Sequence, residues 1–429
     1  MNVAFYTLGC KVNQYETESM REQLQNAGYK CDSAVEEADI VIINSCTVTA
    51  ESDRKTRQAV RRFRRMLPNA VIVLCGCVPA AFPDIDLKLP EADIIISNSG
   101  EGTLCSLLDR YFAEGKKISA VMPHEKGEAY KTPSITSFSE RTRAFVKIED
   151  GCDRFCSYCI IPFARGRVRS RSIDSIRREI ESLARGGFKE IVLVGINLSA
   201  YGKGEEIDLC DAVRAVAEVE GIERVRLGSL EPDHISDGML LRLKAEPKFC
   251  PQFHLSLQSG CDATLKRMNR HYDSAFYRDL VSRIRVIFPD AAITTDIMVG
   301  FAGETDEEFS QSLAFAKEIG FAKAHIFCYS RRKGTVADKL PSQIENALKT
   351  KRSHILADAC EQSENDFLKN QLGRVFPVLF ETEENGFCFG YTPNYTRVKV
   401  PATEGLCGNI ADVLLNSVVD GCCLGQLVK

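Results

Sequence analysis

The cysteines of the segment GCDRFCSYC have the spacing that points most directly to chemistry. Cys152, Cys156 and Cys159 form the pattern C-x3-C-x2-C directly after an apolar segment, AFVKIE. Three thiolates this close on one loop suit a [4Fe-4S] cluster, because each iron takes one ligand and the missing fourth cysteine leaves one iron open. The alternative is structural zinc, which usually takes four protein ligands from paired CxxC motifs, so the spacing favours the cluster.

The whole chain contains 18 cysteines in 429 residues, and its composition limits their roles. The N-terminal segment MNVAFYTLGCKVNQ has no basic region before a long apolar stretch, so it predicts a strand and not a signal peptide. No apolar run approaches the roughly 18 residues that span a bilayer, and we expect a cytoplasmic protein that uses no membrane. Disulfides are rare in that reducing compartment, so metal-binding or catalytic cysteines are favoured. The formal net charge of -4 gives no global sign of nucleic-acid binding.

The first part of the chain alternates short apolar segments with helical patterns. The segments VAFYTLG, DIVIINSC and AVIVLCGC lead into or end on Cys10, Cys46 and Cys77, and DIIISN follows them. Such a series predicts a parallel sheet whose functional loops lie at the carboxyl ends of its strands. Neighbouring strand ends meet along one edge, so these thiols can come together without a local motif. Buried structural cysteines are the other interpretation.

Changes in pattern divide the rest of the chain. A polar stretch at about 124 to 143, HEKGEAYKTPSITSFSERTR, is typical of a linker. Strand and helix patterns then alternate up to about residue 340, which predicts a partial or full (β/α) barrel with its site at the carboxyl ends of the strands. From GRVFPVLFE onward, period-2 segments separated by Gly, Pro and Asn predict a small antiparallel β domain. The fold class is α/β, with expected domains at 1–135, 140–370 and 371–429.

The segment GCDRFCSYC resembles the signature loop of the radical S-adenosylmethionine (SAM) superfamily. TLGCKVNQYETE, INSCTVTAESDRKTR and VLCGCVPA, together with the small β domain, resemble the methylthiotransferases over essentially the full chain. The resemblance implies a radical SAM barrel, a C-terminal TRAM domain that binds substrate, and a second [4Fe-4S] cluster held by Cys10, Cys46 and Cys77. Cys75 is the local alternative to Cys77, which is preferred because the family's cysteine follows the glycine.

The resemblance also implies the reaction. The open iron of the barrel cluster chelates SAM, and an electron cleaves it to methionine and a 5′-deoxyadenosyl radical. A second SAM methylates a sulfur on the other cluster, the radical abstracts a hydrogen from the acceptor carbon, and a methylthio group replaces that hydrogen. The cofactors carry this chemistry, so the role of the protein is to bind the cofactors and the substrate and to position them. The electron donor that the family suggests is a flavodoxin or ferredoxin.

Three segments match places where the superfamily contacts SAM. Tyr158, between the last two cysteines, would lie near the adenine. VLVGINLSAYG stands where many relatives have Gly-Gly-Glu for the SAM amino group, and this chain has Gly195 and Asn197 instead. DIMVGFAGET resembles the turn that closes on the adenine, near Gly300 and Phe301, and an ordinary strand-to-helix turn is equally consistent with it.

Three branches of the family share this architecture and differ in the acceptor: isopentenyl-adenosine in tRNA, threonylcarbamoyl-adenosine in tRNA, or an aspartate of a small-subunit ribosomal protein. The KVNQYETE run after Cys10 most resembles the threonylcarbamoyl-adenosine branch. The isopentenyl branch tends to have a Gln-Met-Asn run there, and the ribosomal branch a Pro-Lys-Asn run. We therefore expect C2 methylthiolation of threonylcarbamoyl-adenosine at position 37, in the tRNA anticodon stem-loop. The alternative from another class is a non-enzymatic, metal-containing RNA-binding protein.

Local basic segments support an RNA partner at the level of residues. RKTRQAVRRFRR carries seven Lys or Arg and no acid. Arg54, Arg57, Arg61 and Arg65 recur at helical spacing, which predicts a basic stripe for phosphates or, alternatively, a solvated helix face. In ARGRVRSR every second residue is an arginine, so an extended chain would present all four on one face. That face could line an RNA path, or the arginines could form ion pairs with the barrel. For the aromatic segment FCFGYTPNYTRVKV we keep two interpretations: its rings stack on the bases of single-stranded RNA, or they fill the core of the sheet.

A further expectation concerns the acceptor's carboxylate. Threonylcarbamoyl-adenosine carries one, and a site that selects it needs a planar bidentate donor. The turn after the strand segment AKAHIFCYS places Arg331 and Arg332 at the carboxyl end of a barrel strand. We therefore expect Arg331 or Arg332 to bind the carboxylate.

Overall fold

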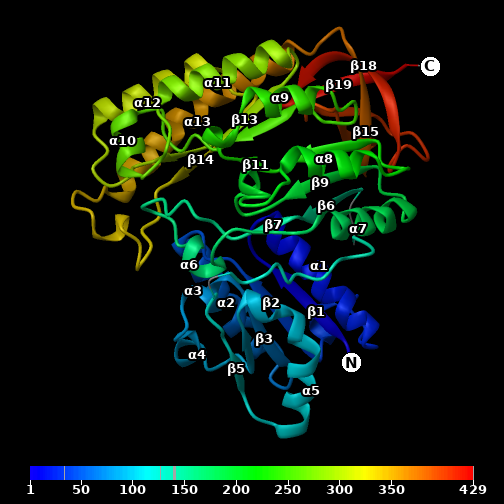
Figure 1. The fold of residues 1–429 in the computed structure, drawn as a ribbon, viewed down its shortest axis with the longest axis vertical. Coiled ribbons are helices and arrows are strands. Elements are labelled where there is room, and N and C mark those ends of the chain that lie inside the picture. The colour runs from blue at the N-terminus through cyan, green and yellow to red at the C-terminus, as the bar shows by residue number, and fades with distance from the viewer. Residues whose placement is uncertain (33, 126, 139–141, 429) are drawn as a thin grey trace.

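The computed structural model describes residues 1–32, 34–125, 127–138 and 142–428. Figure 1 shows the N-terminal domain in blue and cyan below, a larger domain in green, yellow and orange above it, and the red C-terminal domain beside the latter. The α/β class and the order of the three domains are as predicted. The expected start of the central domain, residue 140, lies outside the described residues. No helix of the described ranges is long and apolar enough to cross a membrane.

The N-terminal domain is built on a parallel sheet whose strands lie side by side in sequence order. Its strands are β1 (Val3–Thr7), β2 (Ile40–Ser45), β3 (Val71–Gly76), β4 (Ile94–Ile96) and β5 (Ile118–Ala120). Its helices are α1 (Lys11–Asn26), α2 (Ala50–Met66), α3 (Cys77–Ala81), α4 (Ile85–Lys88) and α5 (Leu104–Glu114). Helices α1 and α5 pack on one face of the sheet and α2 on the other. The loops after β1, β2 and β3 therefore share one edge, as predicted.

The central domain is a partial barrel of parallel strands. One sheet has the order β10-β9-β6 and the other β11-β12-β13-β14, and β10 continues into β11 across Gly228. The strands are β6 (Arg143–Lys147), β7 (Glu149–Asp150), β8 (Arg169–Ser170), β9 (Glu190–Val194), β10 (Arg224–Leu227), β11 (Ser229–Leu230), β12 (Gln252–Leu255), β13 (Ala292–Val299) and β14 (Lys323–Cys328). Among the described residues no pairing joins β6 to β14, so the barrel stays open there.

Helices cover the outside of this barrel. They are α6 (Ile161–Arg165), α7 (Ile173–Arg185), α8 (Leu209–Ala217), α9 (Asp237–Lys244), α10 (Asp262–Arg267), α11 (Ser274–Ile287), α12 (Asp306–Ile319) and α13 (Asn346–Lys369). Short 3-10 helices lie at Val35–Glu37, Asn98–Thr103, Leu198–Ala200, Pro232–His234 and Ala337–Lys339. In α7, Ile176, Ile180 and Leu183 recur every three or four residues and are buried against the strands. Burial of such apolar faces positions the strand ends that carry the site.

The segment between the first two domains is packed and not a free linker. Ile135 and Phe138 are buried in the same apolar core as the barrel strands. The Tyr130 hydroxyl donates to the Lys147 carbonyl at 2.8 Å, and the Tyr15 hydroxyl of α1 donates to the Pro133 carbonyl at 3.2 Å. This segment therefore seals the contact between the N-terminal domain and the barrel.

The C-terminal domain is a small closed barrel with the order β15-β16-β17-β19-β18. Its strands are β15 (Val375–Glu384), β16 (Phe387–Tyr391), β17 (Arg397–Pro401), β18 (Ile410–Val419) and β19 (Cys422–Leu427). All pairs are antiparallel, as predicted, except β17 with β19, which run parallel. The Tyr391 and Tyr395 rings stack with centroids 4.5 Å apart. Arg397 lies over Phe389 on the outer surface, so the aromatic segment is not simply core.

Candidate active site

Three cysteines lie at the carboxyl edge of the N-terminal sheet, as the strand pattern predicted. Cys10 precedes α1 after β1, Cys46 follows β2, and Cys77 begins α3 directly after β3. These strands are neighbours in the sheet. Burial raises the pKa of the Cys77 thiol to about 12, and the nearby thiols of Cys46 and Cys10 add to the rise. Cys46 and Cys77 are buried and Cys10 is exposed. Thiols become thiolates when a metal binds them, which suits these residues as ligands of a metal cluster.

The turn between β3 and α3 supports Cys77 over Cys75 as the third ligand. Gly76 has φ +87°, and a Cβ there would lie 2.4 Å from the Asn44 Oδ1 atom, so only glycine fits. Cys75 lies in the strand before this turn, with its sulfur 3.8 Å from the Met20 sulfur in the core beneath α1. Cys77 lies after the turn, at the edge of the sheet.

The barrel cysteines lie on the loop between β7 and α6. The Cys152 N–H donates to the Gly166 carbonyl at 3.0 Å, and the Cys159 N–H donates to the Cys156 carbonyl at 2.9 Å. Burial raises the pKa of the Cys152 thiol to about 12, and the neighbouring Cys156 thiol adds to the rise. The loop is thereby folded back on itself and holds its three thiols together.

Gly151 sets the position of this loop. It has φ +88°, and a Cβ there would lie 2.0 Å from the Arg167 carbonyl oxygen. We expect Gly151→Ala to displace the Cys152 end of the loop and to lower the iron bound per chain after anaerobic reconstitution. Gly187→Ala is the matched control, because Gly187 has φ +90° with no atom within 4 Å of an added Cβ. An equal loss of iron from both variants would contradict this role of Gly151.

The number of thiols in each group matches the ligand count of a [4Fe-4S] cluster with one open iron. Within the described ranges, no three His, Cys, Asp or Glu side chains come close enough together to hold one ion. The thiolates of a [4Fe-4S] cluster each bind a different iron, so they stand apart and do not meet at one point. A structural zinc ion needs ligands within about 2.3 Å of one centre. Three thiols in each group, one ligand for each of three irons, are what supports a cluster here.

One buried arginine contacts each group of cysteines. The Arg270 Nη1 atom donates to the Cys156 sulfur at 3.2 Å, and Arg270 also pairs with Glu231. The Arg165 Nε atom donates to the Cys77 sulfur, also at 3.2 Å. Sequence reasoning missed both contacts. The only signal for the second was an arginine at the end of the short apolar segment IIPFAR, just after the cysteine loop.

The predicted adenine contacts come together beside the cysteine loop. Tyr158 and Phe301 lie edge to face with ring centroids 6.3 Å apart. Phe301 is fully buried, and its ring packs against that of Tyr158. The Gly300 N–H donates to the Glu304 carboxylate at 3.0 Å, within a strand-to-helix turn.

Gly195 and Asn197 follow β9 and lie beside Glu149 of β7. The Asn197 N–H donates to Glu149 Oε2 at 2.7 Å. Among the described residues, Asn197 Oδ1 and Glu149 Oε1 are buried acceptors that have no hydrogen-bond partner. The ammonium group of SAM carries N–H donors that such acceptors need, so these residues fit SAM. Sequence reasoning missed Glu149, although an acidic pair ending an apolar strand, VKIED, was an available signal.

A cavity of about 780 Å³ is lined by all three domains. Cys10 and Lys11 come from the N-terminal domain, Gly195 from the barrel, and Tyr391 and Tyr395 from the C-terminal domain. Its volume is in the range of small-molecule sites. Cys10, at the edge of the N-terminal sheet, and Gly195, in the barrel, thus line the same cavity.

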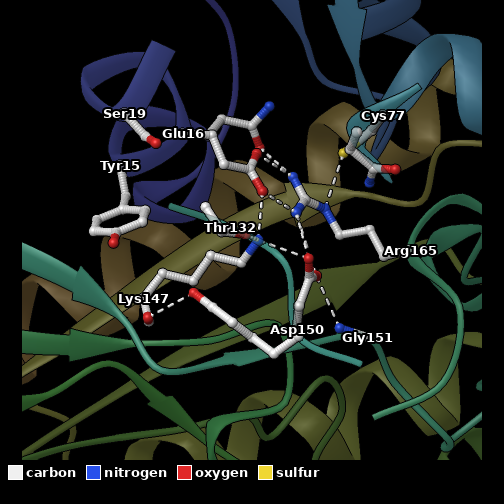
Figure 2. A network of polar contacts seen from close by, with 12 residues as sticks. Tyr15, Glu16, Ser19, Cys77, Thr132, Lys147, Asp150, Gly151 and Arg165 are labelled. Atoms are coloured by element: carbon white, nitrogen blue, oxygen red, sulfur yellow. Dashed lines mark hydrogen bonds and ion pairs between the residues drawn. The ribbon is translucent and has the colours of Figure 1, made fainter. Parts of the chain in front are cut away.

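A buried polar network holds the N-terminal domain against the barrel (Figure 2). Arg165 donates to both carboxylate oxygens of Glu16, at 2.6 and 2.8 Å, and lies 3.3 Å from an oxygen of Asp150. Lys147 donates to Glu16 and to Asp150, each at 2.6 Å. Burial alone would raise the pKa of Asp150, but Lys147 and Arg165 hold it below its usual range. The charges of the network therefore balance inside the interface.

The predicted basic stripe lies on the surface of α2. Arg54, Arg61 and Arg65 are exposed and Arg57 is half-buried. A hollow of about 370 Å³ beside the stripe is lined by Tyr6, Lys55, Gln58, Ala59, Arg61, Arg62 and Arg65. No acid is among these lining residues, although Arg54 and Arg61 pair with Glu51 and Glu91 nearby. The hollow is thus suited to an anion.

The prediction that ARGRVRSR forms one extended basic face is wrong. Arg165 ends α6, and only Arg169–Ser170 forms a strand. Arg171 is buried in an ion pair with Glu179 at 2.5 Å, and Arg169 lies 3.5 Å from Asp150. Ion pairs with the barrel, the alternative interpretation, account for Arg169 and Arg171.

The turn after β14 is used for contact between domains. Arg332 is buried, pairs with Asp53 of α2 at 2.6 Å and donates to Thr47 at 2.7 Å. Arg331 is exposed and pairs with Asp338 at 2.6 Å. Neither is among the residues that line the large cavity. The structure thus contradicts the expectation that Arg332 faces the acceptor, because its guanidinium closes the domain interface.

Comparisons with known proteins agree with this architecture. Residues 2–97 match the model of "Uncharacterized protein family UPF0004", and residues 146–316 match that of the "Radical SAM superfamily". A solved radical S-adenosylmethionine methyltransferase, TsrM from Kitasatospora setae, has a similar fold, with a TM-score of 0.58 and 16% identity, over 78% of this chain and 76% of that chain.

Two curated relatives match nearly the full chain. "Threonylcarbamoyladenosine tRNA methylthiotransferase MtaB" of Bacillus subtilis (strain 168) is 36% identical over 96% of this chain and 93% of that protein. "tRNA-2-methylthio-N(6)-dimethylallyladenosine synthase" of Clostridium perfringens (strain SM101 / Type A) is 36% identical over 99% of this chain and 97% of that protein. The chain therefore belongs to the radical SAM methylthiotransferase family and is an enzyme that uses an iron–sulfur cluster and SAM.

Proposed function

We propose that the enzyme methylthiolates C2 of threonylcarbamoyladenosine at position 37, in the anticodon stem-loop of tRNA. It does so with two [4Fe-4S] clusters, two SAM molecules and an electron donor such as a flavodoxin or ferredoxin. The observation that carries the proposal is the pair of three-cysteine groups on adjoining domains, with Cys10 and Gly195 opening on one cavity. The identity with the threonylcarbamoyladenosine enzyme of Bacillus subtilis supports this acceptor.

The protein's own residues bind the clusters and SAM and orient them. The bound clusters and SAM supply the electron, the radical and the methylthio group. Cys152, Cys156 and Cys159 hold the barrel cluster, and Asn197 and Glu149 accept hydrogen bonds from the SAM ammonium group. The other cysteine group, Cys10, Cys46 and Cys77, holds the auxiliary cluster at the edge of the N-terminal sheet.

The choice of acceptor needs its own test, because the dimethylallyladenosine enzyme of Clostridium perfringens has the same 36% identity to this chain as the threonylcarbamoyladenosine enzyme. The test offers reconstituted enzyme three acceptors: tRNA with threonylcarbamoyladenosine, tRNA with isopentenyladenosine, and the small-subunit ribosomal protein. Mass spectrometry of the products identifies the acceptor by a methylthio gain on one of them. A gain only on isopentenyladenosine or on the ribosomal aspartate would overturn the proposal. Colourless protein that binds zinc and no iron would instead support the RNA-binding alternative.

The basic hollow on α2 is expected to bind tRNA phosphates. We expect Lys55→Ala and Arg65→Ala each to weaken tRNA binding and to lower the salt dependence, log K against log salt, by about 1. Binding isotherms at several salt concentrations measure both. Lys116→Ala is the matched control, because Lys116 is exposed after α5, which packs on the opposite face of the sheet. Equal weakening by the control would contradict a specific role for the hollow.

A further inference from the structure

Arg165 uses every N–H donor of its guanidinium group. Its Nε donates to the Cys77 sulfur at 3.2 Å, Nη1 to Glu16 at 2.6 Å and Asp150 at 3.3 Å, and Nη2 to Glu16 at 2.8 Å and Asn13 at 3.3 Å. Arg165 is 0% exposed. A planar group with five donors satisfied in five directions has one orientation, so its Nε–H stays aimed at the sulfur.

The contacts of Arg165 connect the elements that carry the two cysteine groups. Arg165 ends α6, which follows the Cys159 end of the barrel loop, and α6 packs against α3, the helix that Cys77 begins. Glu16 belongs to α1, the helix that starts directly after Cys10. Figure 2 shows the Arg165 side chain reaching from the barrel to Glu16 on one side and Cys77 on the other. One side chain thus contacts the supports of both groups.

The contact with Cys77 also has an electrostatic effect. Cys77 is 2% exposed, so a negative charge on its sulfur is screened little by water. A guanidinium group stays charged at any working pH, and N–H donors to the sulfurs of a cluster stabilise its reduced, more negative form. Neighbouring donors of this kind also orient the ligand.

We propose that Arg165 is a positioning residue of the auxiliary cluster: it holds the Cys77 ligand in place and raises the reduction potential of that cluster. The inference rests on the proposed function, because it requires a cluster on Cys10, Cys46 and Cys77. It separates the roles within the network: Glu16 and Asp150 neutralise charge, Asn13 Oδ1 accepts from the Cys10 thiol at 3.4 Å, and Arg165 donates to the Cys77 sulfur.

The test isolates the auxiliary cluster in the full chain carrying Cys152→Ala, Cys156→Ala and Cys159→Ala. This protein is expected to keep about four irons. Adding Arg165→Lys keeps the positive charge and removes the directed Nε–H. We expect a shift of the midpoint potential to a more negative value in a redox titration monitored by EPR, and faster loss of iron to a chelator.

Arg171→Lys is the matched control in the same protein. Arg171 is also a buried arginine at this interface, paired with Glu179 and bonded to the Tyr15 hydroxyl, and within the described residues its hydrogen bonds and ion pairs reach no cysteine. It is expected to lower stability without shifting the potential. If Arg165→Lys does not fold, Glu16→Gln, which loosens the guanidinium group, is expected to speed the loss of iron to a chelator. Its potential is not compared, because removing the Glu16 charge near Cys77 itself favours the reduced cluster.

The outcomes distinguish this inference from the proposed function. A protein with the three barrel cysteines replaced that binds no iron would overturn the second cluster and the inference with it. An iron-loaded protein whose potential is the same with Arg165→Lys, or equally shifted by Arg171→Lys, would overturn the role of Arg165 alone.

A second inference rests on the charges of the large cavity. Lys11 lines the cavity directly after Cys10, and no ion pair joins it to a carboxylate among the described residues. Arg143 and Arg226 lie near enough to repel its charge, and Glu190 near enough to attract it. Glu190 already pairs with both arginines, and Arg143 pairs with Glu381 as well. By contrast, the cavity lysine at position 323 is neutralised by Glu364 at 2.9 Å. This end of the cavity therefore carries unbalanced positive charge.

We infer that Lys11 binds the carboxylate of the threonylcarbamoyl group, in place of the arginines after β14. The inference again rests on the proposed function. In the described structure Lys11 and Arg397 are the lysine and arginine of the cavity lining without a carboxylate partner, and Arg397 lies over the Phe389 ring. Of the two, Lys11 adjoins a proposed cluster ligand, Cys10. A charge-assisted hydrogen bond here favours the acid form of the acceptor over a neutral one.

The test compares stem-loop RNA carrying threonylcarbamoyladenosine with the same RNA whose carboxyl group is converted to the amide. Wild-type enzyme is expected to prefer the acid in kcat/KM, and Lys11→Gln to lose that preference by roughly tenfold to a hundredfold. Lys11→Arg, with its charge kept, is expected to retain it. Iron content is measured in every variant to exclude damage at Cys10.

Two results separate the failures. An unchanged acid-to-amide ratio in iron-loaded Lys11→Gln would overturn the role of Lys11. Wild-type enzyme that turns over neither form, but does act on isopentenyladenosine, would overturn the proposed acceptor.

Discussion

Replacing Cys156 by alanine is expected to abolish SAM cleavage and methylthio transfer together, down to the background of the assay. The barrel loop offers three thiols, and each iron of its cluster takes one ligand, so no spare cysteine on the loop can replace it. The Arg270 donor that bonds the Cys156 sulfur also loses its partner. The measurements are 5′-deoxyadenosine released from SAM, methylthio product by mass spectrometry, and iron per chain, which is expected to fall by about half.

Cys261→Ala is the control for this loss. Cys261 is another buried cysteine of the barrel, with its sulfur 3.2 Å from the Gln311 carboxamide oxygen, and it lies outside the loop. The control is expected to keep its iron and both activities. Continued release of 5′-deoxyadenosine by iron-depleted Cys156→Ala would refute the assignment of the barrel cluster.

Replacing Cys77 by alanine is expected to stop methylthio transfer and to spare SAM cleavage. Cys77 belongs to the N-terminal domain, while the barrel loop keeps its own three thiols, its backbone hydrogen bonds and its contact with Arg270. The same assays separate the two activities, and iron is again expected to fall by about half. Loss of both activities in a folded variant that keeps the barrel cluster would contradict this division of labour.

The chain offers a matched control two positions away. Cys75 has the same side chain and is also buried, but it packs in the core beneath α1. Cys75→Ala is therefore expected to reduce stability while iron content and methylthio transfer persist. Loss of the auxiliary cluster in Cys75→Ala with its retention in Cys77→Ala would reverse the ligand assignment.

The sequence predicted the fold and the cysteine groups well, for a physical reason. Strands that are apolar and separated by helices must run parallel, so the residues that follow them meet at one edge whatever their distance along the chain. Cys10, Cys46 and Cys77 could be grouped on that basis. Cys152 and Cys156 needed only local spacing.

Buried charge was the part that the sequence could not reveal. Charged residues are mostly exposed, so a run of arginines predicts a surface. Arg165, Arg171 and Arg332 are instead buried, because carboxylates from distant segments meet them when the domains pack. Those partners are set by tertiary structure, and no period in the local sequence reports them.

The long helix α13 has a consequence for how the cavity tolerates changes in length. It packs along β14, reaches β18 of the C-terminal barrel, and lines the cavity with Glu361 and Phe367. Each residue of an α-helix turns the chain by about 100°. Deleting one residue from α13 would therefore swing Tyr391 and Tyr395 around the helix axis and away from Cys10. The number of residues in α13 thus determines the direction in which the C-terminal barrel faces. A deletion of about one full turn, three or four residues, is the smallest that turns Tyr391 and Tyr395 back toward Cys10.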